Sequence, residues 1–444
     1  MTSYLLARAL VFGRVVERVR IRVDEGTGTI SGVDEGAEPI AGERVLGGMA
    51  LPGIANAHSH AFHRALRGRT HDEGGDFWSW RDTMYRAAAG LDPELYRRLA
   101  TAFFVELLCA GFTAVGEFHY LHRRSDGSGY PRSEAMSEAL AAAARDSGIR
   151  LTLLDAAYLH GGLSPLGAQL PKSGAQLRFG DPSVAEWRAR HDGVCGLASA
   201  TVRVGAAVHS VRSVDPAAIA AIAALVGRDA PLHAHVSEQA AENAQSAAAY
   251  GATPVEVLAR AGALGPSFTA VHATHLSARD VALLAAADAT VCVCPSTERD
   301  LGDGIVELGV LRDAGVRVAI GSDQHVVVDP FDELRQLEGH ERLARGRRGT
   351  LDPARQLEAA CAGGYRSLGW DAPGFRVGAP ADLVVVDEAS PRTAGTLPAQ
   401  LWTAATAADV THVVVAGRLV VEDGHHRIGE PGRLLADAIA EVMR

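Results

Sequence analysis

The feature that most constrains the fold is a repeated alternation of short apolar runs with amphipathic segments, which begins near residue 51. Eight strand-like runs occur, at 51–57, 113–118, 150–157, 202–208, 231–236, 268–272, 290–294 and 316–320. Intervening segments repeat apolar residues every three or four positions, and several end in glycine, as helices do. The clearest are 93–110, 133–147, 216–226, 238–250 and 278–287. Eight such units predict an α/β fold, a (β/α)8 TIM-like barrel with functional residues at the carboxyl ends of its strands.

The two ends of the chain have a different pattern from the predicted barrel at 50–377. Residues 1–49 and 378–444 contain short strands separated by glycine-rich turns, and 434–444 reads as a terminal helix. We expect the late strands to pair with the early ones, so that a small β-sandwich domain is built from both termini. A chain of 444 residues is long enough for a barrel and such an accessory domain.

Charge and cysteine content limit the partners and the compartment. The formal net charge of −10 argues against nucleic acid and an anionic membrane surface as partners. It also means that an anionic substrate needs a local group of arginines. The five cysteines show no disulfide or zinc-knuckle spacing, and residues 1–23 are interrupted by charges rather than forming a signal peptide. These features predict a cytoplasmic protein.

Four side chains at predicted strand ends have the chemistry of metal ligands. His58 and His60 stand two residues apart on the first strand, so they point to the same face. His235 lies at the end of the fifth strand, and Asp323 follows the eighth. A lone His-x-His pair would as readily be two surface histidines, but all four residues fall where a barrel gathers its site. Three imidazoles and a carboxylate suit zinc and leave a coordination position open for water.

Two further residues at strand ends are candidates for acid–base chemistry. Glu238 follows His235 by three residues and could carry a proton from the attacking water to a departing nitrogen. It also reads as an acidic residue that opens a helix, and both interpretations can be true. His272 could stabilise the developing charge, and His275 is the alternative. His233 shares a face with His235, which the nearby Glu238 favours as the ligand.

The single lysine of the chain limits the number of metals. Lys172 lies in a predicted loop at about 161–182 that is rich in glycine, proline and serine, so no predicted strand offers a lysine that could be carboxylated to bridge two metals. The sequence therefore predicts a site with one metal.

These motifs resemble the amidohydrolase superfamily, in its branch of single-metal aminohydrolases. The resemblance rests on His58-Ser-His60, His235-Val-Ser-Glu238, His272 and Ser322-Asp323, and on late strands that begin at Gly378 and Val415. The branch includes deaminases of cytosine, guanine, adenosine derivatives and triazines, so these motifs alone select no substrate.

Other motifs, across nearly the whole chain, resemble the formimidoylglutamate deiminase family. They are Asn56-Ala-His-Ser-His-Ala-Phe, Phe77-Trp-Ser-Trp-Arg81, Glu117-Phe-His-Tyr120-Leu-His, Val208-His209-Ser-Val-Arg212-Ser-Val, Val271-His-Ala-Thr-His and Cys294-Pro-Ser-Thr-Glu-Arg-Asp-Leu-Gly-Asp-Gly. The resemblance implies hydrolysis of N-formimidoyl-L-glutamate to N-formyl-L-glutamate and ammonia in histidine degradation, with one zinc ion per chain, and a homodimer. It implies zinc ligands at His58, His60, His235 and Asp323, and catalytic roles for Glu238, His272 and Asp323.

The resemblance also implies a pocket for a small dicarboxylate substrate. Its positions are Arg81, Tyr120, His209, Arg212 and His63. Arginine binds a carboxylate through two parallel hydrogen bonds, which suits a substrate derived from glutamate. At His63 the chain departs from the family pattern, which has glutamine there. Neutral histidine also offers both a donor and an acceptor.

Two other functions are compatible with these motifs. One is an aminohydrolase of a heteroaromatic amine such as guanine, whose pocket needs aromatic walls more than two arginines. The other is a scaffold protein that kept the barrel and lost the chemistry, against which the complete set of candidate ligands argues.

Overall fold

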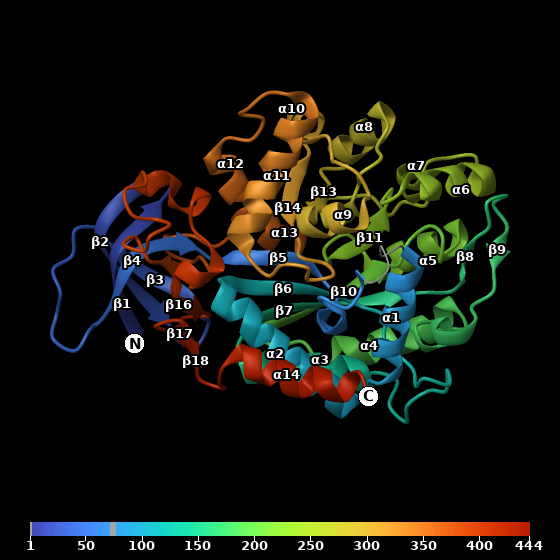
Figure 1. Ribbon diagram of the computed structural model, residues 1–444, viewed down its shortest axis with the longest axis horizontal. Helices are drawn as coiled ribbons and strands as arrows, with labels where there is room; N and C mark the ends of the chain where they lie inside the picture. Colours follow the sequence, from blue (N-terminus) through green and yellow to red (C-terminus); the bar gives the residue numbers. More distant parts are fainter. Residues whose placement is uncertain (1, 72–76) are drawn as a thin grey trace.

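Eight parallel strands form the barrel of the computed structural model, which describes residues 2–71 and 77–444 (Figure 1). They are β5 (Ile54–Ser59), β6 (Phe112–His119), β7 (Arg150–Ala157), β10 (Val202–Val208), β11 (Leu232–Val236), β12 (Phe268–His272), β13 (Thr290–Val293) and β14 (Arg317–Ile320). Each strand pairs with its neighbour in the sequence. A bridge between Ser59 and Asp323 joins the two ends of the sheet. The predicted barrel and all eight of its strands are confirmed.

Helices surround the barrel, and several of them begin at a side-chain cap or end in glycine. They are α1 (Phe77–Ala89), α2 (Pro93–Ala110), α3 (Ala135–Ser147), α4 (Val184–Cys195), α5 (Pro216–Val226), α6 (Ala240–Tyr250), α7 (Pro254–Arg260), α8 (Ala278–Ala286), α9 (Pro295–Leu301), α10 (Leu308–Asp313), α11 (Pro330–Arg345), α12 (Pro353–Glu358), α13 (Gly364–Ser367) and α14 (Pro431–Val442). Helix α2 shows the usual signals: Asp92 accepts from the backbone N–H of Leu95, a proline follows, and Gly111 ends the helix at φ 105°. Among the described residues no helix combines the length and apolarity needed to cross a membrane.

Strands from both termini form a second sheet beside the barrel, at the left of Figure 1. The early strands are β1 (Thr2–Val11), β2 (Arg14–Asp24), β3 (Thr29–Asp34) and β4 (Arg44–Pro52), and the late ones are β15 (Leu383–Val386), β16 (Val410–Val415), β17 (Arg418–Glu422) and β18 (His425–His426). Antiparallel pairing of β4 with β15 joins the two sets into one continuous sheet. Strand β4 continues to Pro52, so this sheet takes in residues just beyond 49.

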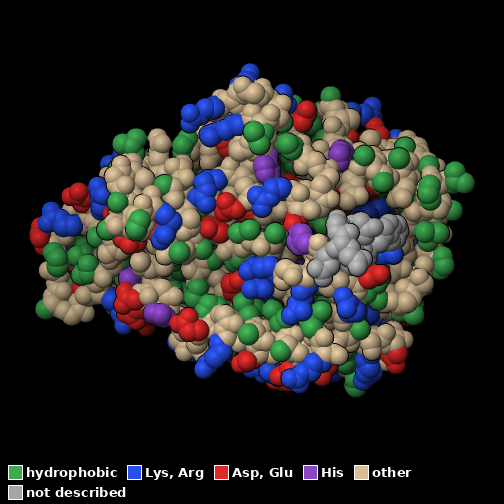
Figure 2. Space-filling model, in the orientation of Figure 1, with side chains coloured by type: hydrophobic (Ala, Val, Ile, Leu, Met, Phe, Trp, Pro, Cys, Tyr) green, Lys and Arg blue, Asp and Glu red, His purple; other side chains and the backbone are tan. Residues whose placement is uncertain are grey.

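A buried ion pair links this terminal sheet to the amino-terminal end of a barrel strand. Arg150, which begins β7, donates two hydrogen bonds to the carboxylate of Asp382, at 2.8 and 2.9 Å. Tyr365 donates a third, at 2.6 Å. Helix α14 lies along α2 at the bottom of Figure 1, where Arg98 pairs with Glu441 at 2.7 Å. Figure 2 shows acidic and basic side chains interspersed over one face of the molecule.

Candidate active site

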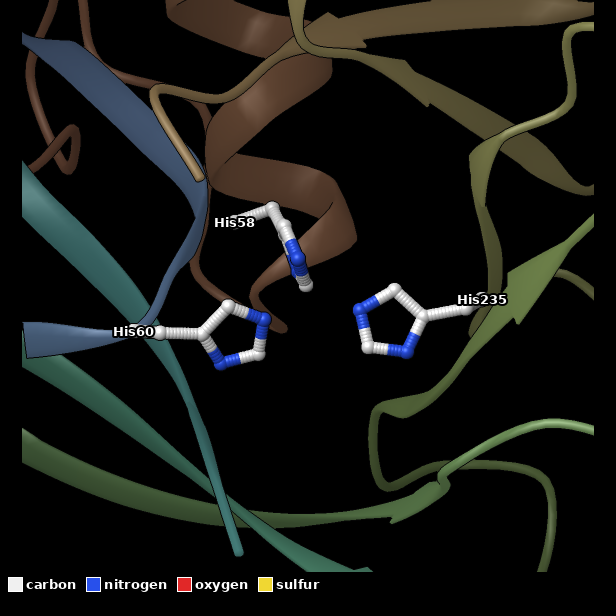
Figure 3. A group of neighbouring side chains, drawn as sticks. All are labelled: His58, His60 and His235. Carbon is white, nitrogen blue, oxygen red and sulfur yellow. The ribbon is translucent and has the colours of Figure 1, made fainter. Parts of the chain in front are cut away.

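Three histidines from two strands meet at the carboxyl end of the barrel. The imidazoles of His58, His60 and His235 turn toward one another (Figure 3), with ring centroids 4.7 to 5.5 Å apart. Each of the three offers a nitrogen within 4.8 Å of the others. Asp323 closes the group, with Oδ1 at 3.2 Å from His58 Nε2 and 3.3 Å from His60 Nε2. All four residues predicted as metal ligands are therefore brought together.

The hydrogen bonds of these histidines leave nitrogen lone pairs free to bind a metal. His60 Nδ1 donates to the carbonyl of Phe118 at 2.8 Å, and His235 Nδ1 donates to that of His209 at 2.9 Å, so each Nε2 is the free acceptor. His58 is fully buried; its Nδ1 has no hydrogen-bond partner within the described part of the chain, and its Nε2 faces Asp323 Oδ1. Burial lowers the pKa of His58 to about 3 and that of His235 to about 4, which keeps both neutral, as ligation requires. The donor set fits zinc or a similar divalent ion.

The structure separates His235 from its neighbour on the same strand. His233 Nε2 donates to the carbonyl of Ser367 at 2.8 Å, and burial lowers its pKa to about 4. It is thus a fully buried histidine, two residues before the metal-ligand candidate on the same strand. The alternation of a strand puts both on one face, and only the tertiary contacts tell them apart.

Glu238 lies in the turn between β11 and α6 and not on the helix. The helix predicted to begin at 238 begins at Ala240, because Ser237 adopts a left-handed conformation, φ 50°, that redirects the chain. Glu238 Oε1 lies 3.9 Å from His272 Nε2 and faces the same cavity. The helix therefore begins two residues after Glu238, and the interpretation of Glu238 as the residue that opens it is wrong.

His272 ends β12 within a group of carboxylates. Its Nδ1 donates to Glu298 Oε1 at 3.3 Å. Burial pulls the pKa of His272 down, but the negative charges of Glu238, Glu298 and Asp323 outweigh burial and raise it well above the ordinary value. These carboxylates favour the protonated imidazole, which can donate from Nε2. The alternative residue, His275, instead donates from Nε2 to the carbonyl of Asp303 at 2.7 Å.

Two buried glutamates near the site were not identified as functional from the sequence. Glu298 also accepts the backbone N–H of Cys294 at 2.8 Å. Glu117 accepts the N–H of Ala61 at 2.6 Å and the hydroxyl of Ser59 at 2.7 Å, so it holds the backbone on both sides of a metal-ligand candidate. Burial raises the pKa of Glu117 to about 8. Each lies in one of the motifs that resemble the formimidoylglutamate deiminase family, but only the tertiary contacts show which groups its carboxylate binds.

A cavity of about 330 Å³ opens above the histidines. All five residues predicted to bind substrate line it: His63, Arg81, Tyr120, His209 and Arg212. His63 Nε2 lies 2.9 Å from the Tyr120 hydroxyl, and Arg212 Nη2 lies 3.5 Å from Glu238 Oε2. Burial lowers the pKa of His63 to about 4, so this histidine is neutral.

The cavity wall also contains residues that the sequence did not single out. Several are aromatic or come from the segment 161–182, which was predicted as a loop: Trp80, Tyr85, Tyr158, Gly161, Gly162, Leu163, Leu170, Gln176 and Phe179. That segment forms a short hairpin of β8 (Gly162–Leu163) and β9 (Gln169–Leu170), followed by a 3-10 turn. The side chains of residues 77–79, in the motif before Arg81, lie outside those described.

Comparison with known proteins places this site in a family. The model of the amidohydrolase family matches residues 49–420. The chain belongs to the amidohydrolase family. This membership confirms the family resemblance and the predicted enzyme class, a hydrolase.

Individual relatives span the whole chain but differ in activity. Formimidoylglutamate deiminase of Pseudomonas aeruginosa is 37% identical, with all of both chains covered. A 5-methylthioadenosine/S-adenosylhomocysteine deaminase of Natronomonas pharaonis is 30% identical over 95% of this chain and 93% of the relative. Among solved structures, an amidohydrolase from Brucella melitensis has a TM-score of 0.92 at 32% identity, with both chains fully covered. A zinc-bound adenosine deaminase from Xanthomonas campestris has a TM-score of 0.83 at 25% identity, over 99% of this chain and 97% of the other.

Proposed function

We propose that the protein hydrolyses N-formimidoyl-L-glutamate to N-formyl-L-glutamate and ammonia, using one zinc ion per chain. The observation that carries the proposal is a pair of arginines, Arg81 and Arg212, in the wall of a cavity whose floor holds the histidine and aspartate group. The likeness to the Pseudomonas enzyme over its full length supports the same substrate.

Different side chains bind the substrate, transfer protons and stabilise charge in the proposed reaction. His58, His60, His235 and Asp323 would hold the metal, which would supply a nucleophile by lowering the pKa of a water molecule. The arginines hold the two carboxylates, which brings the formimidoyl carbon within reach of that water. Glu238 accepts the proton that the water loses as its oxygen bonds to this carbon. His272 donates toward the charge that develops on the substituents of this carbon, and Glu238 returns the proton to the imino nitrogen. Glu238 then carries the remaining hydroxyl proton to the same nitrogen as the carbon–nitrogen bond breaks, the carbonyl forms and ammonia leaves.

A second candidate substrate is a heteroaromatic amine. The aromatic side chains of the cavity, among them Tyr85, Tyr158 and Phe179, could stack on a ring. The relationship to the nucleoside-type deaminase of Natronomonas supports the same alternative. A purine has no carboxylate for the two arginines, which is why formimidoylglutamate is preferred.

Ammonia release decides between the candidates. The zinc-loaded protein is assayed with N-formimidoyl-L-glutamate, its aspartate analogue, guanine and 5-methylthioadenosine. We expect turnover of formimidoylglutamate, and a loss of at least about 10- to 100-fold in kcat/KM in Arg212→Met, because a hydrogen bond to a charged group contributes about 1.5–3 kcal/mol. Turnover of the purines, with Arg81→Met and Arg212→Met both unaffected on formimidoylglutamate, would reject the dicarboxylate pocket.

The setting of the enzyme is part of the proposal. We place it in the cytoplasm, in histidine degradation, as a homodimer that acts on a small molecule and binds neither nucleic acid nor membrane. The family resemblance supports the pathway and the dimer, and the net charge of −10 supports the absence of polyanionic partners.

A further inference from the structure

The first turn of α6 carries a buried glutamate to which no role has been assigned. Glu242 is 1% exposed and is not among the residues that line the cavity, although its partners Glu238 and Arg212 are. Its Oε2 accepts the backbone N–H of Glu238 at 3.0 Å. Its Oε1 lies 3.7 Å from Arg212 Nε. One side chain therefore contacts both the proton carrier and the substrate-binding arginine of the proposed mechanism.

A helix-capping role explains only half of these contacts. A glutamate in the first turn of a helix commonly accepts a backbone N–H just before the helix, and Oε2 does this. Oε1, however, is buried and has no hydrogen-bond partner among the residues that the structure describes, and the same is true of Arg212 Nε. A buried carboxylate destabilises the fold unless a nearby positive charge compensates it, and Arg212 supplies that positive charge.

Arg212 stands between two carboxylates. Its Nη2 lies 3.5 Å from Glu238 Oε2, while its Nε faces Glu242. Both contacts are longer than a good charge-assisted hydrogen bond, so the guanidinium is not bound fully to either acid. Its side chain stays 28% exposed and lines the cavity. Without the charge of Glu242, Arg212 would face Glu238 alone and would be expected to turn toward it.

We propose that Glu242 is a positioning residue, which holds Arg212 in the orientation that receives a substrate carboxylate and keeps it from closing onto Glu238. The inference rests on the proposed function only in taking Arg212 to bind a carboxylate. It predicts that the effect of Glu242 on ligand binding is transmitted through Arg212.

A double-mutant cycle tests this transmission. The zinc-loaded wild type, Glu242→Gln, Arg212→Met and the double variant are titrated calorimetrically with glutarate, a five-carbon dicarboxylate without the reacting group. We expect Glu242→Gln to weaken glutarate binding by at least about threefold in the wild-type background, a coupling at the lower end of those seen between contacting residues. In the Arg212→Met background the same substitution should change affinity by less than about twofold, well below that coupling. Glu242→Asp, which keeps the charge, should recover part of the lost affinity.

A neighbouring helix supplies the matched control. Glu256 has the same place in the first turn of α7, where it accepts the N–H of Thr253 at 3.2 Å, and it pairs with another arginine, Arg279. Glu256→Gln should leave glutarate affinity unchanged. If Glu242→Gln does not fold, the cycle is run with Glu242→Asp, whose shorter side chain cannot make both contacts.

Three results would overturn the inference: equal loss of affinity in both Arg212 backgrounds, no loss in either, or no binding of glutarate to the wild type. Equal loss would identify Glu242 as a helix cap alone. Ammonia release from formimidoylglutamate is measured separately on the wild type. A non-additive cycle without turnover would leave the inference standing and reject the proposed substrate.

Discussion

Glu238→Gln should separate proton transfer from metal binding and folding. The substitution keeps the size of the side chain and removes its ability to accept and return a proton. Glu238 is not among the four candidate ligands, and it lies in a turn outside α6, so the metal group and the helix should persist. His272 Nε2, 3.9 Å away, would face an amide in place of a carboxylate.

The expected loss follows from the role of the residue. A positioned general acid–base group contributes about 10²–10⁴ in rate, and this corresponds to about 3–5 kcal/mol of barrier. Ammonia release should therefore fall by that factor in kcat, while zinc content by elemental analysis and the melting temperature stay near those of the wild type. Activity within about threefold of wild type would remove Glu238 from the mechanism, because loss of a catalytic general base lowers the rate by at least about 10². Loss of zinc together with activity would make Glu238 a residue of the metal site.

Three further predictions concern the metal, pH and stability. Zinc analysis should find about one ion per chain in the wild type, retained in His233→Ala and lost in His235→Ala; two ions would contradict the single-metal site. Burial raises the pKa of Glu333 to about 8, above its unfolded value, so the stability tied to its protonated form is complete below about pH 4.5 and is lost as the pH rises through 8. Melting temperatures measured across that window should fall less in Glu333→Gln, and an identical slope would refute this. Asp382→Ala leaves Arg150 buried without its partner and should cost about 3–5 kcal/mol in denaturant unfolding; a change below about 1 kcal/mol, the value of an exposed pair, would mean that water reaches the ion pair.

The barrel could be predicted because each of its strands carries its own signal in a short stretch of sequence. Strands of a parallel sheet are covered on both faces, so they read as continuous apolar runs, and β6 and β7 are buried at every residue. The ligand candidates could be predicted for a related reason. Parallel strands in a barrel end at one rim, so a histidine or aspartate at each strand end is placed with the others before any contact is known.

The remaining features depend on contacts that the sequence does not encode locally. Glu242 reads as an ordinary glutamate in the first turn of a helix, and only the approach of Arg212 from another strand end gives it a second partner. Ser237 gave no sign that the chain would turn there with φ 50° and delay the helix. The hairpin in 161–182 supplies part of the cavity wall, although its strands are two residues long, too short for an alternating pattern.

The arrangement around Arg212 bears on how a protein with a net charge of −10 accepts a dianion. In the free protein the negative charges of two carboxylates offset the positive charge of this guanidinium. Arg212 therefore contributes little to the long-range attraction of an anionic substrate. In the proposed mechanism a substrate carboxylate replaces the weak contact with Glu238, because a direct pair of hydrogen bonds to guanidinium is stronger than a contact at 3.5 Å. Binding of the remote carboxylate also fixes the position of the formimidoyl carbon relative to the attacking water. The Arg212→Met variant should therefore lose in kcat as well as in KM, whereas a purely attractive arginine would affect KM alone.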